Sequence, residues 1–216
     1  MRGDGSGGLA VLLALADSRL PIGGHVHSGG VEEAVVSGLV RNAGGVEAYL
    51  ARRVRTSGLV AASLAAAVCD GALSAERADL EADARTPSPA ARAASRAQGR
   101  GLLRLGRQLW PHADWPERGA RPHLSTVFGV AGRACETRAR DLAGVVVYTT
   151  LTGAATAAQR LLALDPATVA AATFRLAPLC DEIAADAVTG LAALSDPLQD
   201  VLAERHLDRD MPLFAS

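Results

Sequence analysis

Long alanine-rich runs with apolar residues at helical spacing constrain this chain more than any other feature. In the segment from Val46 to Cys69, apolar side chains recur at Leu50, Val54 and Leu64, as on one face of a helix. Hydrophobic residues make up 49% of the chain but aromatic residues only 3%, so alanine, leucine and valine have to build the core. Alanine has the highest helix propensity and lets helix axes approach closely. The sequence therefore predicts an all-α fold.

The length of 216 residues fits one domain. A chain of this size buries roughly 70% of its unfolded surface, so it requires no metal or disulfide for stability. We expect residues 1–216 to form a single globular bundle of roughly eight to ten helices, with residues 1–8 as a flexible N-terminus and 208–216 as a mobile C-terminal tail. Cys69, Cys135 and Cys180 lie far apart without a CxxC pair. We interpret them as small buried residues in a reducing compartment.

Helix boundaries are predicted from capping residues, glycines and prolines. The pair Asp70-Gly71 should end the segment that starts after Gly44-Gly45, and Ser74 should cap the next helix. Asp165-Pro166 and Asp196-Pro197 each combine an N-cap acid with a proline at the first helical position. Further helices are expected over 9–17, after a cap at Ser28 or Gly29, over 86–111, over 123–135 and over 141–164, with a linker over 111–122 and a bend near Pro178.

Two segments have an alternative interpretation. The run VVVYTTL (145–151) is rich in β-branched residues and alone would suggest a strand, but its alanine-rich flanks favour a helix. The apolar run from Leu9 to Ala16 could belong to a secretory signal, but it is short and only Arg2 precedes it, beside Asp4. We expect a helix there as well. No stretch reaches the ~18 to 20 apolar residues of a membrane span.

The glycine-rich stretch DSRLPIGGHVHSGGVE (17–32) raises the question of a phosphate or metal site. It lacks the lysine and the preceding strand of a phosphate-binding loop, and Ser28 is not in a G-x-S-x-G motif. His25 and His27 could ligate a metal, but no third ligand follows at a usual spacing. We therefore favour a structural turn. A helical metal-dependent hydrolase using His25, His27 and Glu32 remains the alternative.

All basic side chains apart from histidine are arginines, and the net charge is −1. Without lysine, there is no P-loop lysine, Schiff-base lysine or lysine general base. Five arginines recur at helical spacing and form one stripe: Arg92, Arg96, Arg100, Arg104 and Arg107. Such a stripe is either a solvated face or a docking face for an acidic partner. A helical regulator that binds nucleic acid through this stripe is a third interpretation, which the near-neutral charge disfavours.

Five segments, in order along the chain, carry a family resemblance. Residues 17–32 resemble the D-S-x-L-P-x-G-G/A…S-x-G-x-E pattern of the UreF family of urease accessory proteins. The segments SRAQGRGLL (95–103), HLSTVFG (123–129) and ATAAQRLLAL (155–164) resemble three further motifs of that family, and the end from His206 to MPLFAS resembles its terminal H…R-L-F-x-S. The similarity runs from Leu12 to Ser216. This extent argues against a signal peptide.

The sequence departs from the family pattern at four places. His27 stands where members often have an aromatic residue, and Gly29 where many have glutamine or histidine. Pro212 replaces the terminal arginine, and the turn around Asp165 lacks the usual glycine and glutamine. These departures concern partner contacts rather than family membership.

The resemblance implies a cytoplasmic, all-helical, non-enzymatic chaperone that dimerises. Such proteins bind UreD (also called UreH) and the GTPase UreG, and the assembly delivers nickel to apo-urease. The resemblance also implies no cofactor in this chain, because partners handle nickel and GTP, and neither nucleic acid nor membrane as a partner. In this interpretation the glycine-rich turn presents Ser28 and Glu32 to a partner. The full set expected to bind partners is Pro21, Gly23, Ser28, Gly30, Glu32, Arg96, Gly99, Arg100, His206, Leu213 and Phe214.

Overall fold

The computed structural model describes residues 8–22, 28–117, 119–194, 196–207 and 213. Within these residues there are helices and no strand, which confirms the all-α prediction. The segments are α1 (Leu9–Leu15), α2 (Val31–Val36), α3 (Ala43–Arg53), the π-helix η1 (Val54–Gly58), α4 (Leu59–Cys69), α5 (Ala75–Ala84), α6 (Pro89–Leu109), α7 (Leu124–Ala134), α8 (Ala139–Leu161), α9 (Pro166–Arg175), α10 (Ala177–Asp186) and α11 (Pro197–Leu207). Because α3, η1 and α4 run on without a break, the described chain contains ten separate helices, within the predicted range.

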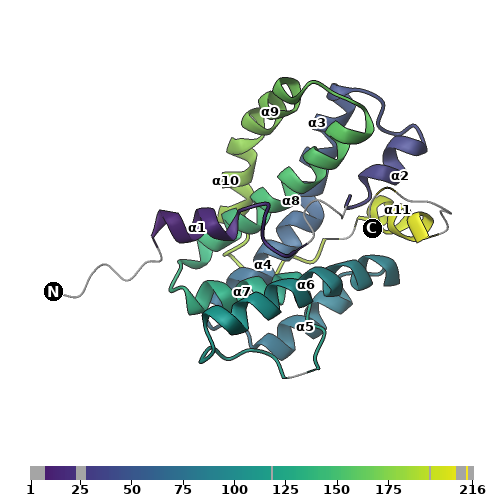
Figure 1. The fold of residues 1–216 in the computed structure, drawn as a ribbon. Coiled ribbons are helices and arrows are strands. Elements are labelled where there is room, and N and C mark those ends of the chain that lie inside the picture. Colours follow the sequence, from purple (N-terminus) through teal and green to yellow (C-terminus); the bar gives the residue numbers. More distant parts are fainter. Residues whose placement is uncertain (1–7, 23–27, 118, 195, 208–212, 214–216) are drawn as a thin grey trace.

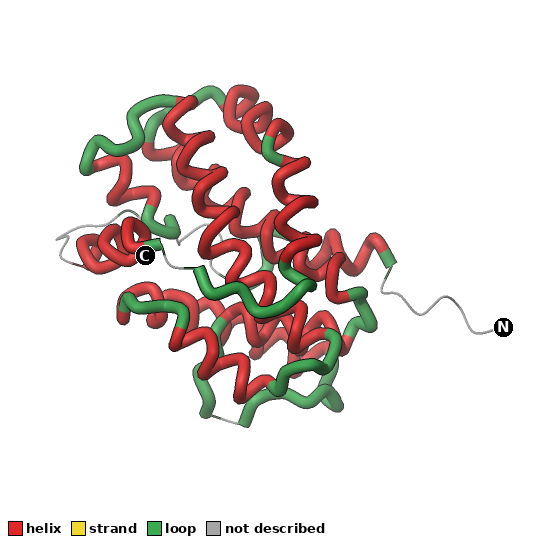
Figure 2. Tube along the Cα trace, turned by 180° about the vertical axis from the view of Figure 1, so that it is seen from behind, coloured by secondary structure: helices red, strands yellow, loops and turns green. Residues whose placement is uncertain are grey.

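Helix α8 is the centre of the arrangement. It packs against α4 and α10 most extensively, and also against α2, α3, α7 and α9. In Figure 1, α5, α6 and α7 lie in the lower part of the molecule, whereas α2, α3 and α9 lie in the upper part beside α8, and Figure 2 shows the molecule from behind. Leu142, Val147 and Leu151 of α8 are fully buried in the main core cluster. The β-branched run is therefore helical as predicted, and its Val145, Val146, Val147 and Leu151 are buried, whereas Tyr148 is 49% exposed.

Several predicted caps are present. The Ser74 hydroxyl accepts a hydrogen bond from the Arg77 amide, and the Asp165 carboxylate accepts one from the Thr168 amide. Gly71 adopts a φ of +88° after the end of α4, as the Asp70-Gly71 pair predicts. These boundaries follow from local chemistry, because each cap satisfies a backbone group within a few residues.

Three predicted boundaries are wrong. Gly30, with a φ of +84°, is the residue before α2, so neither Ser28 nor Gly29 caps that helix. Gly44 and Gly45 do not precede the helix but lie in the first turn of α3, because the Asn42 side chain caps this helix by accepting a hydrogen bond from the Gly45 amide. Instead of one helix bent near Pro178, α9 and α10 are separate helices. Pro178 lies in the first turn of α10, where its missing N–H costs no helical hydrogen bond.

The remaining expectations concern cysteines, membrane segments and chain ends. All three cysteines are free, and burial raises the pKa of the Cys135 and Cys180 thiols to about 11.

Among the described residues no helix has the length and apolarity needed to cross a membrane. The expected flexible segments, 1–8 and 208–216, lie outside the described residues except for Gly8 and Leu213.

Candidate functional site

Helix α6 brings together three of the segments that resemble UreF motifs. Gly99 lies so close to the start of α7 that a Cβ at this position would overlap the Pro122 carbonyl oxygen. Gly101 approaches the first motif in the same way, because a Cβ there would overlap the Pro21 carbonyl oxygen. The glycines of SRAQGRGLL are therefore packing positions for the other two motifs. Sequence reasoning assigned Pro21 and Gly99 to partner binding, but the structure shows that both contact this chain itself.

The glycine-rich turn packs around a guanidinium group rather than a phosphate. Gly29 and Gly30 have φ values of +59° and +84°, and a Cβ on Gly29 would clash with Arg53. Arg53 Nη1 donates hydrogen bonds to the Gly29 carbonyl at 2.6 Å and to Gln199 Oε1 at 2.8 Å. The Tyr49 hydroxyl donates to the same carbonyl at 3.1 Å and accepts from Gln199 Nε2. The described part of this turn thus joins α3 to α11.

Ser28 and Glu32 are buried within this chain, so the expectation that the turn exposes them is wrong, and their contact with a partner stays a prediction. Ser28, in the turn before α2, is 0% exposed, and Glu32, in the first turn of α2, is 2% exposed. The Glu32 carboxylate accepts a hydrogen bond from the Leu213 amide at 2.8 Å and lies 3.8 Å from Nδ1 of the buried His206. Two candidate partner-binding residues, Glu32 and His206, therefore connect α2 with α11 and the end of the chain. The Leu213 side chain is 77% exposed.

The arginine stripe separates into two classes. Arg96 binds the carboxylates of Asp79 and Asp83 at 2.8 and 2.7 Å, so the expectation that it lies on an open docking face is wrong. Arg92 and Arg107 donate to carbonyl groups of the adjoining loops. Arg100 and Arg104 are exposed. Only these last two side chains retain the geometry of a docking surface.

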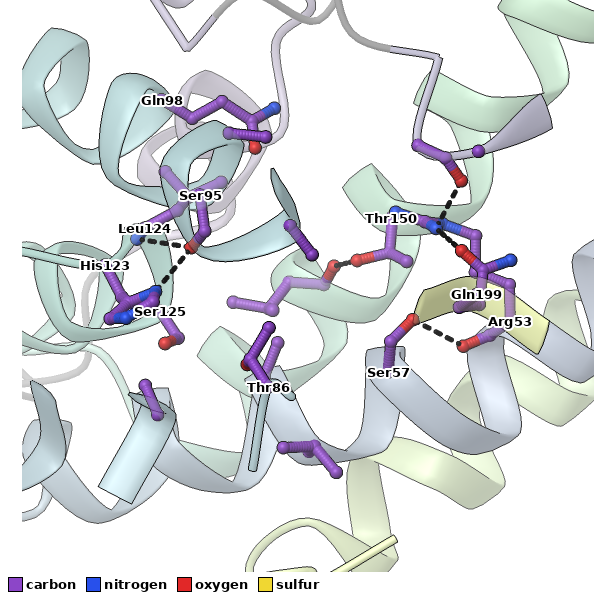
Figure 3. Close-up of a pocket in the computed structure, with 18 of the residues that line it drawn as sticks. Arg53, Ser57, Thr86, Ser95, Gln98, His123, Leu124, Ser125, Thr150 and Gln199 are labelled. Atoms are coloured by element: carbon purple, nitrogen blue, oxygen red, sulfur yellow. Dashed lines mark hydrogen bonds between the residues drawn. The ribbon is translucent and has the colours of Figure 1, made fainter. Parts of the chain in front are cut away.

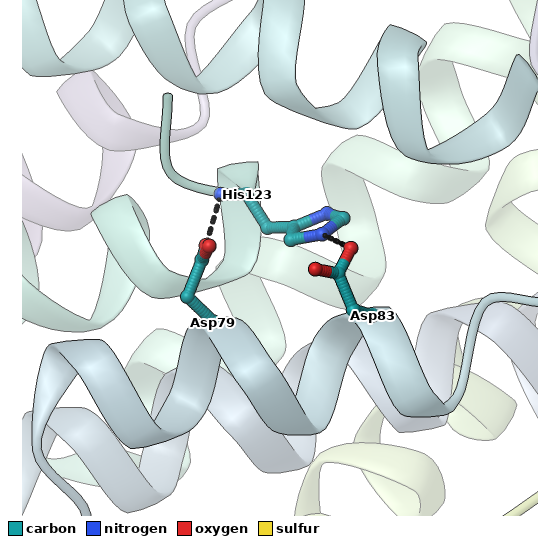
Figure 4. Close-up of side chains that lie close together, drawn as sticks. All are labelled: Asp79, Asp83 and His123. Carbon is teal, nitrogen blue, oxygen red and sulfur yellow. Dashed lines mark hydrogen bonds and ion pairs between the residues drawn. The ribbon is translucent and has the colours of Figure 1, made fainter. Parts of the chain in front are cut away.

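Arg96 belongs to a polar network that sequence reasoning did not find, and Figure 4 shows three of its other members, Asp79, Asp83 and His123. His123 Nε2 lies 2.9 Å from Asp83 Oδ1, Nδ1 lies 3.0 Å from Ser95 Oγ, and the His123 amide donates to Asp79 at 2.6 Å. Burial lowers the pKa of His123, although the nearby carboxylates oppose this change. Burial tends to raise the pKa of Asp83, but hydrogen bonding from His123 and the Arg96 charge lower it overall. His123 is therefore neutral and Asp83 ionised at pH 7.

This network joins α5, α6 and α7 and is not arranged for chemistry. Ligand atoms of Asp79, Asp83 and His123 lie within 4.8 Å of one another, as in a metal site. However, the Arg96 guanidinium binds both carboxylates, so a positive charge is already in place. Ser95, His123 and Asp83 are also the residue types of a hydrolase triad, but the Ser95 oxygen accepts from the Leu124 amide as well. We found no sequence signal for these contacts, because 40 residues separate Asp83 from His123.

A cavity of about 270 Å³ lies where these segments meet (Figure 3). Its walls include Ser28 from the glycine-rich turn, Ser95 from α6 and His123 at the start of α7. Arg53 and Thr150 contribute from the opposite side, next to the π-helix. Although π-helical turns are often found at functional sites, sequence reasoning singled out neither η1 nor Arg53.

The polar groups of these motifs, in the part of the chain that the structure describes, hold the helices of an all-α protein together. A family model for UreF matches residues 40–177. A urease accessory protein UreF from Mycolicibacterium vanbaalenii is 67% identical over 211 residues, covering 96% of this chain and 99% of the relative.

Two further relatives carry the same name. Urease accessory protein UreF from Mycobacterium marinum is 61% identical and that from Mycobacterium tuberculosis 59%, each over 208 residues, covering 96% of this chain and 99% of the relative. The chain belongs to the UreF family of urease accessory proteins, and it is not a catalytic enzyme.

This membership weighs against the hydrolase alternative. Of its three residues, Glu32 is buried and binds the Leu213 amide, whereas His25 and His27 lie outside the described residues. Gly23 and Phe214, both expected to bind partners, lie outside them as well.

Proposed function

We propose that this protein promotes nickel incorporation into apo-urease as a chaperone in a cytoplasmic complex with UreD and the GTPase UreG. The observation that carries the proposal is identity of 59 to 67% to proteins named UreF over nearly their whole length. Nickel is the cargo of this process, and GTP is the substrate of UreG. The chain itself is proposed to act as a homodimer, without a cofactor of its own and without nucleic-acid or membrane partners.

An exposed apolar surface supports a role in assembly. Helices α2 and α11 contact each other, and these helices and the segments that follow them carry large exposed apolar side chains. We call this the α2–α11 surface and define it by Val36, Leu39, Val201, Leu207 and Leu213. Apolar residues gathered on adjoining elements are typical of protein–protein contact sites. We propose that UreD binds here, and that Arg100 and Arg104 form a separate polar contact site.

Deleting the gene in a urease-positive host tests the function. We expect normal amounts of urease protein with little bound nickel, and restoration by the wild-type gene. Nickel is measured in the purified urease by mass spectrometry. Normal nickel content in the deletion strain would contradict the proposal.

A charge placed on the α2–α11 surface tests the contact. Leu39→Asp should prevent co-purification with UreD, whereas Leu80→Asp should not, because Leu80 is similarly exposed but lies on α5. Equal capture by both variants would show that UreD binds elsewhere. Co-purification of wild-type protein with neither UreD nor UreG would contradict the proposed complex.

A further inference from the structure

Helix α6 begins with only half of a capping box. In a complete capping box, the N-cap side chain accepts a hydrogen bond from the amide of the third helical residue, and a glutamate or glutamine at that third position accepts one from the N-cap amide. Ser88 forms the first half, because its hydroxyl accepts from the Ala91 amide at 3.0 Å. Ala91 occupies the third helical position, and an alanine side chain cannot form the second half.

Helix α11 supplies the missing half. The Asp200 carboxylate accepts a hydrogen bond from the Ser88 amide at 3.2 Å, which is the bond that a glutamate at position 91 would make. The Glu204 carboxylate accepts from the Ala90 amide at 3.0 Å and from the Ser88 hydroxyl. The bonds from the Ser88 hydroxyl and the Ala90 amide lower the pKa of Glu204. The capping box of α6 is therefore completed by another helix, 112 residues further along the chain.

Helix α11 depends on α6 in return. Asp200 and Glu204 are four positions apart on α11, so their negative charges are neighbours on one face of this helix and repel each other. The positive N-terminal end of α6 and the Arg92 charge face these carboxylates and offset the repulsion. The buried apolar residues of α11 are Leu202 and Ala203, so apolar contacts alone hold it weakly.

The further polar contacts of α11 lie toward its two ends. Arg52 binds Asp196 directly before the helix, and Gln199 in its first turn accepts from Arg53. Near its other end, His206 lies 3.8 Å from the Glu32 carboxylate. The contact with the start of α6 therefore holds the middle of α11.

We propose that α11 and the first two turns of α6 open and close as one unit, coupled through this divided capping box. When α11 leaves α6, the Ser88 and Ala90 amides lose their acceptors and the start of α6 frays. When the start of α6 frays, Asp200 and Glu204 lose their compensation and α11 loosens. The coupling is reciprocal because both effects arise from the same hydrogen bonds.

Hydrogen exchange of the purified full-length protein, followed by mass spectrometry, tests the coupling from the α11 side. The readout is the amides of residues 92–95, which bond within α6 and to its cap rather than to α11. Glu204→Ala should speed their exchange about 2- to 30-fold, the range for a lost helix cap. Arg205→Ala is the matched control, because Arg205 is the exposed neighbour of Glu204 on the same helix, and it should leave this exchange unchanged.

Ser88→Ala tests the reverse direction. It removes the hydroxyl that binds Glu204, so exchange of the amides of residues 201–205 in α11 should become faster. Ser74→Ala is the matched control, because Ser74 caps α5 in the same way, and it should leave α11 unchanged. Effects confined to the helix that carries the substitution, or equal effects of the controls, would overturn the proposal. An equal acceleration in α8 would show a loss of global stability instead and would overturn it as well.

A consequence for assembly rests on the proposed UreD contact. A partner bound to the α2–α11 surface stabilises the docked state of α11 by mass action, so UreD should slow exchange at residues 92–95 as well as in α11. Protection of α11 alone would contradict the coupling. Because the variants are measured without UreD, failure of UreD to bind would refute the proposed contact and leave the coupling in place.

Discussion

Replacing Gly99 by alanine measures how tightly α6 is packed against the start of α7. The new Cβ would overlap the Pro122 carbonyl oxygen and lie 3.1 Å from the Leu124 nitrogen, and both are backbone atoms that cannot rotate away. Overpacking of this kind costs about 1 to 3 kcal/mol. Alanine also favours a helix over glycine by about 0.5 to 1 kcal/mol, which opposes part of this cost.

Gly153→Ala is the matched control. Gly153 lies inside α8, and a Cβ there meets no atom within 4 Å, so the same substitution should stabilise the protein by about 0.5 to 1 kcal/mol. Because the helix preference cancels between the two variants, their difference isolates the overlap at about 1 to 3 kcal/mol. For a chain of this length, that corresponds to melting temperatures separated by about 2 to 12 °C.

Urea unfolding followed by circular dichroism at 222 nm gives the free energies of both variants. We expect Gly99→Ala to be less stable than Gly153→Ala by the stated difference with similar slopes. Equal stability would show that α6 and the Pro122–Leu124 segment are not in close contact, and would refute the account of this motif as a packing position.

Three further predictions concern charged and terminal groups. Arg96→Ala should lower the free energy of unfolding by about 1 to 3 kcal/mol, because it removes a donor from two carboxylates. Arg104→Ala, at an exposed position, should change it by less than about 0.5 kcal/mol. Urea unfolding measures both free energies, and equal effects of the two substitutions would contradict the ion pairs of Arg96. Since folding lowers the pKa of His123 below its unfolded value of about 6.5, its contribution is complete above that pH and is lost as the pH falls toward the folded pKa. Stability measured from pH 7.5 to 5 should therefore decline, and an equally steep decline in His123→Asn would exclude this residue as the cause. Leu213→Ala should leave the melting temperature unchanged but weaken co-purification with UreD. Deletion of residues 211–216 should weaken it too and also lower the melting temperature, because the buried Glu32 carboxylate loses its hydrogen bond from the Leu213 amide. An unaltered melting temperature after the deletion would show that this hydrogen bond does not contribute to stability.

Helices and their local caps could be predicted because their causes lie within a few residues. Ser74 and Asp165 satisfy amides three positions ahead, and the alanine-rich flanks of VVVYTTL outweigh its strand preference. Asn42 was missed because two glycines next to it are a stronger general signal for a break than one asparagine is for a cap.

Burial and pairing could not be predicted, because they depend on contacts between distant segments. Spacing places Arg96 and Arg100 on the same stripe, but only Arg96 faces the carboxylates of α5. Ser28 and Glu32 look like exposed polar residues of a turn, but both are buried, Glu32 where α2 packs against α11. Ser95, Arg96, His123 and Glu32, four polar residues of these motifs, make internal contacts.

The two close approaches on α6 also determine how rigidly this helix is held. Gly99 and Gly101 are two positions apart, or about 200° around a helix and about 3 Å along it, so the Pro122 and Pro21 segments contact nearly opposite sides of the same turn of α6. Neither sliding along the axis nor turning about it is compatible with both contacts. The backbone at Arg100, between the two glycines, is therefore held in place, and its Cα–Cβ bond has one fixed direction. A protein that binds Arg100 therefore meets a helix whose backbone is already ordered, so binding carries little further loss of backbone entropy in α6.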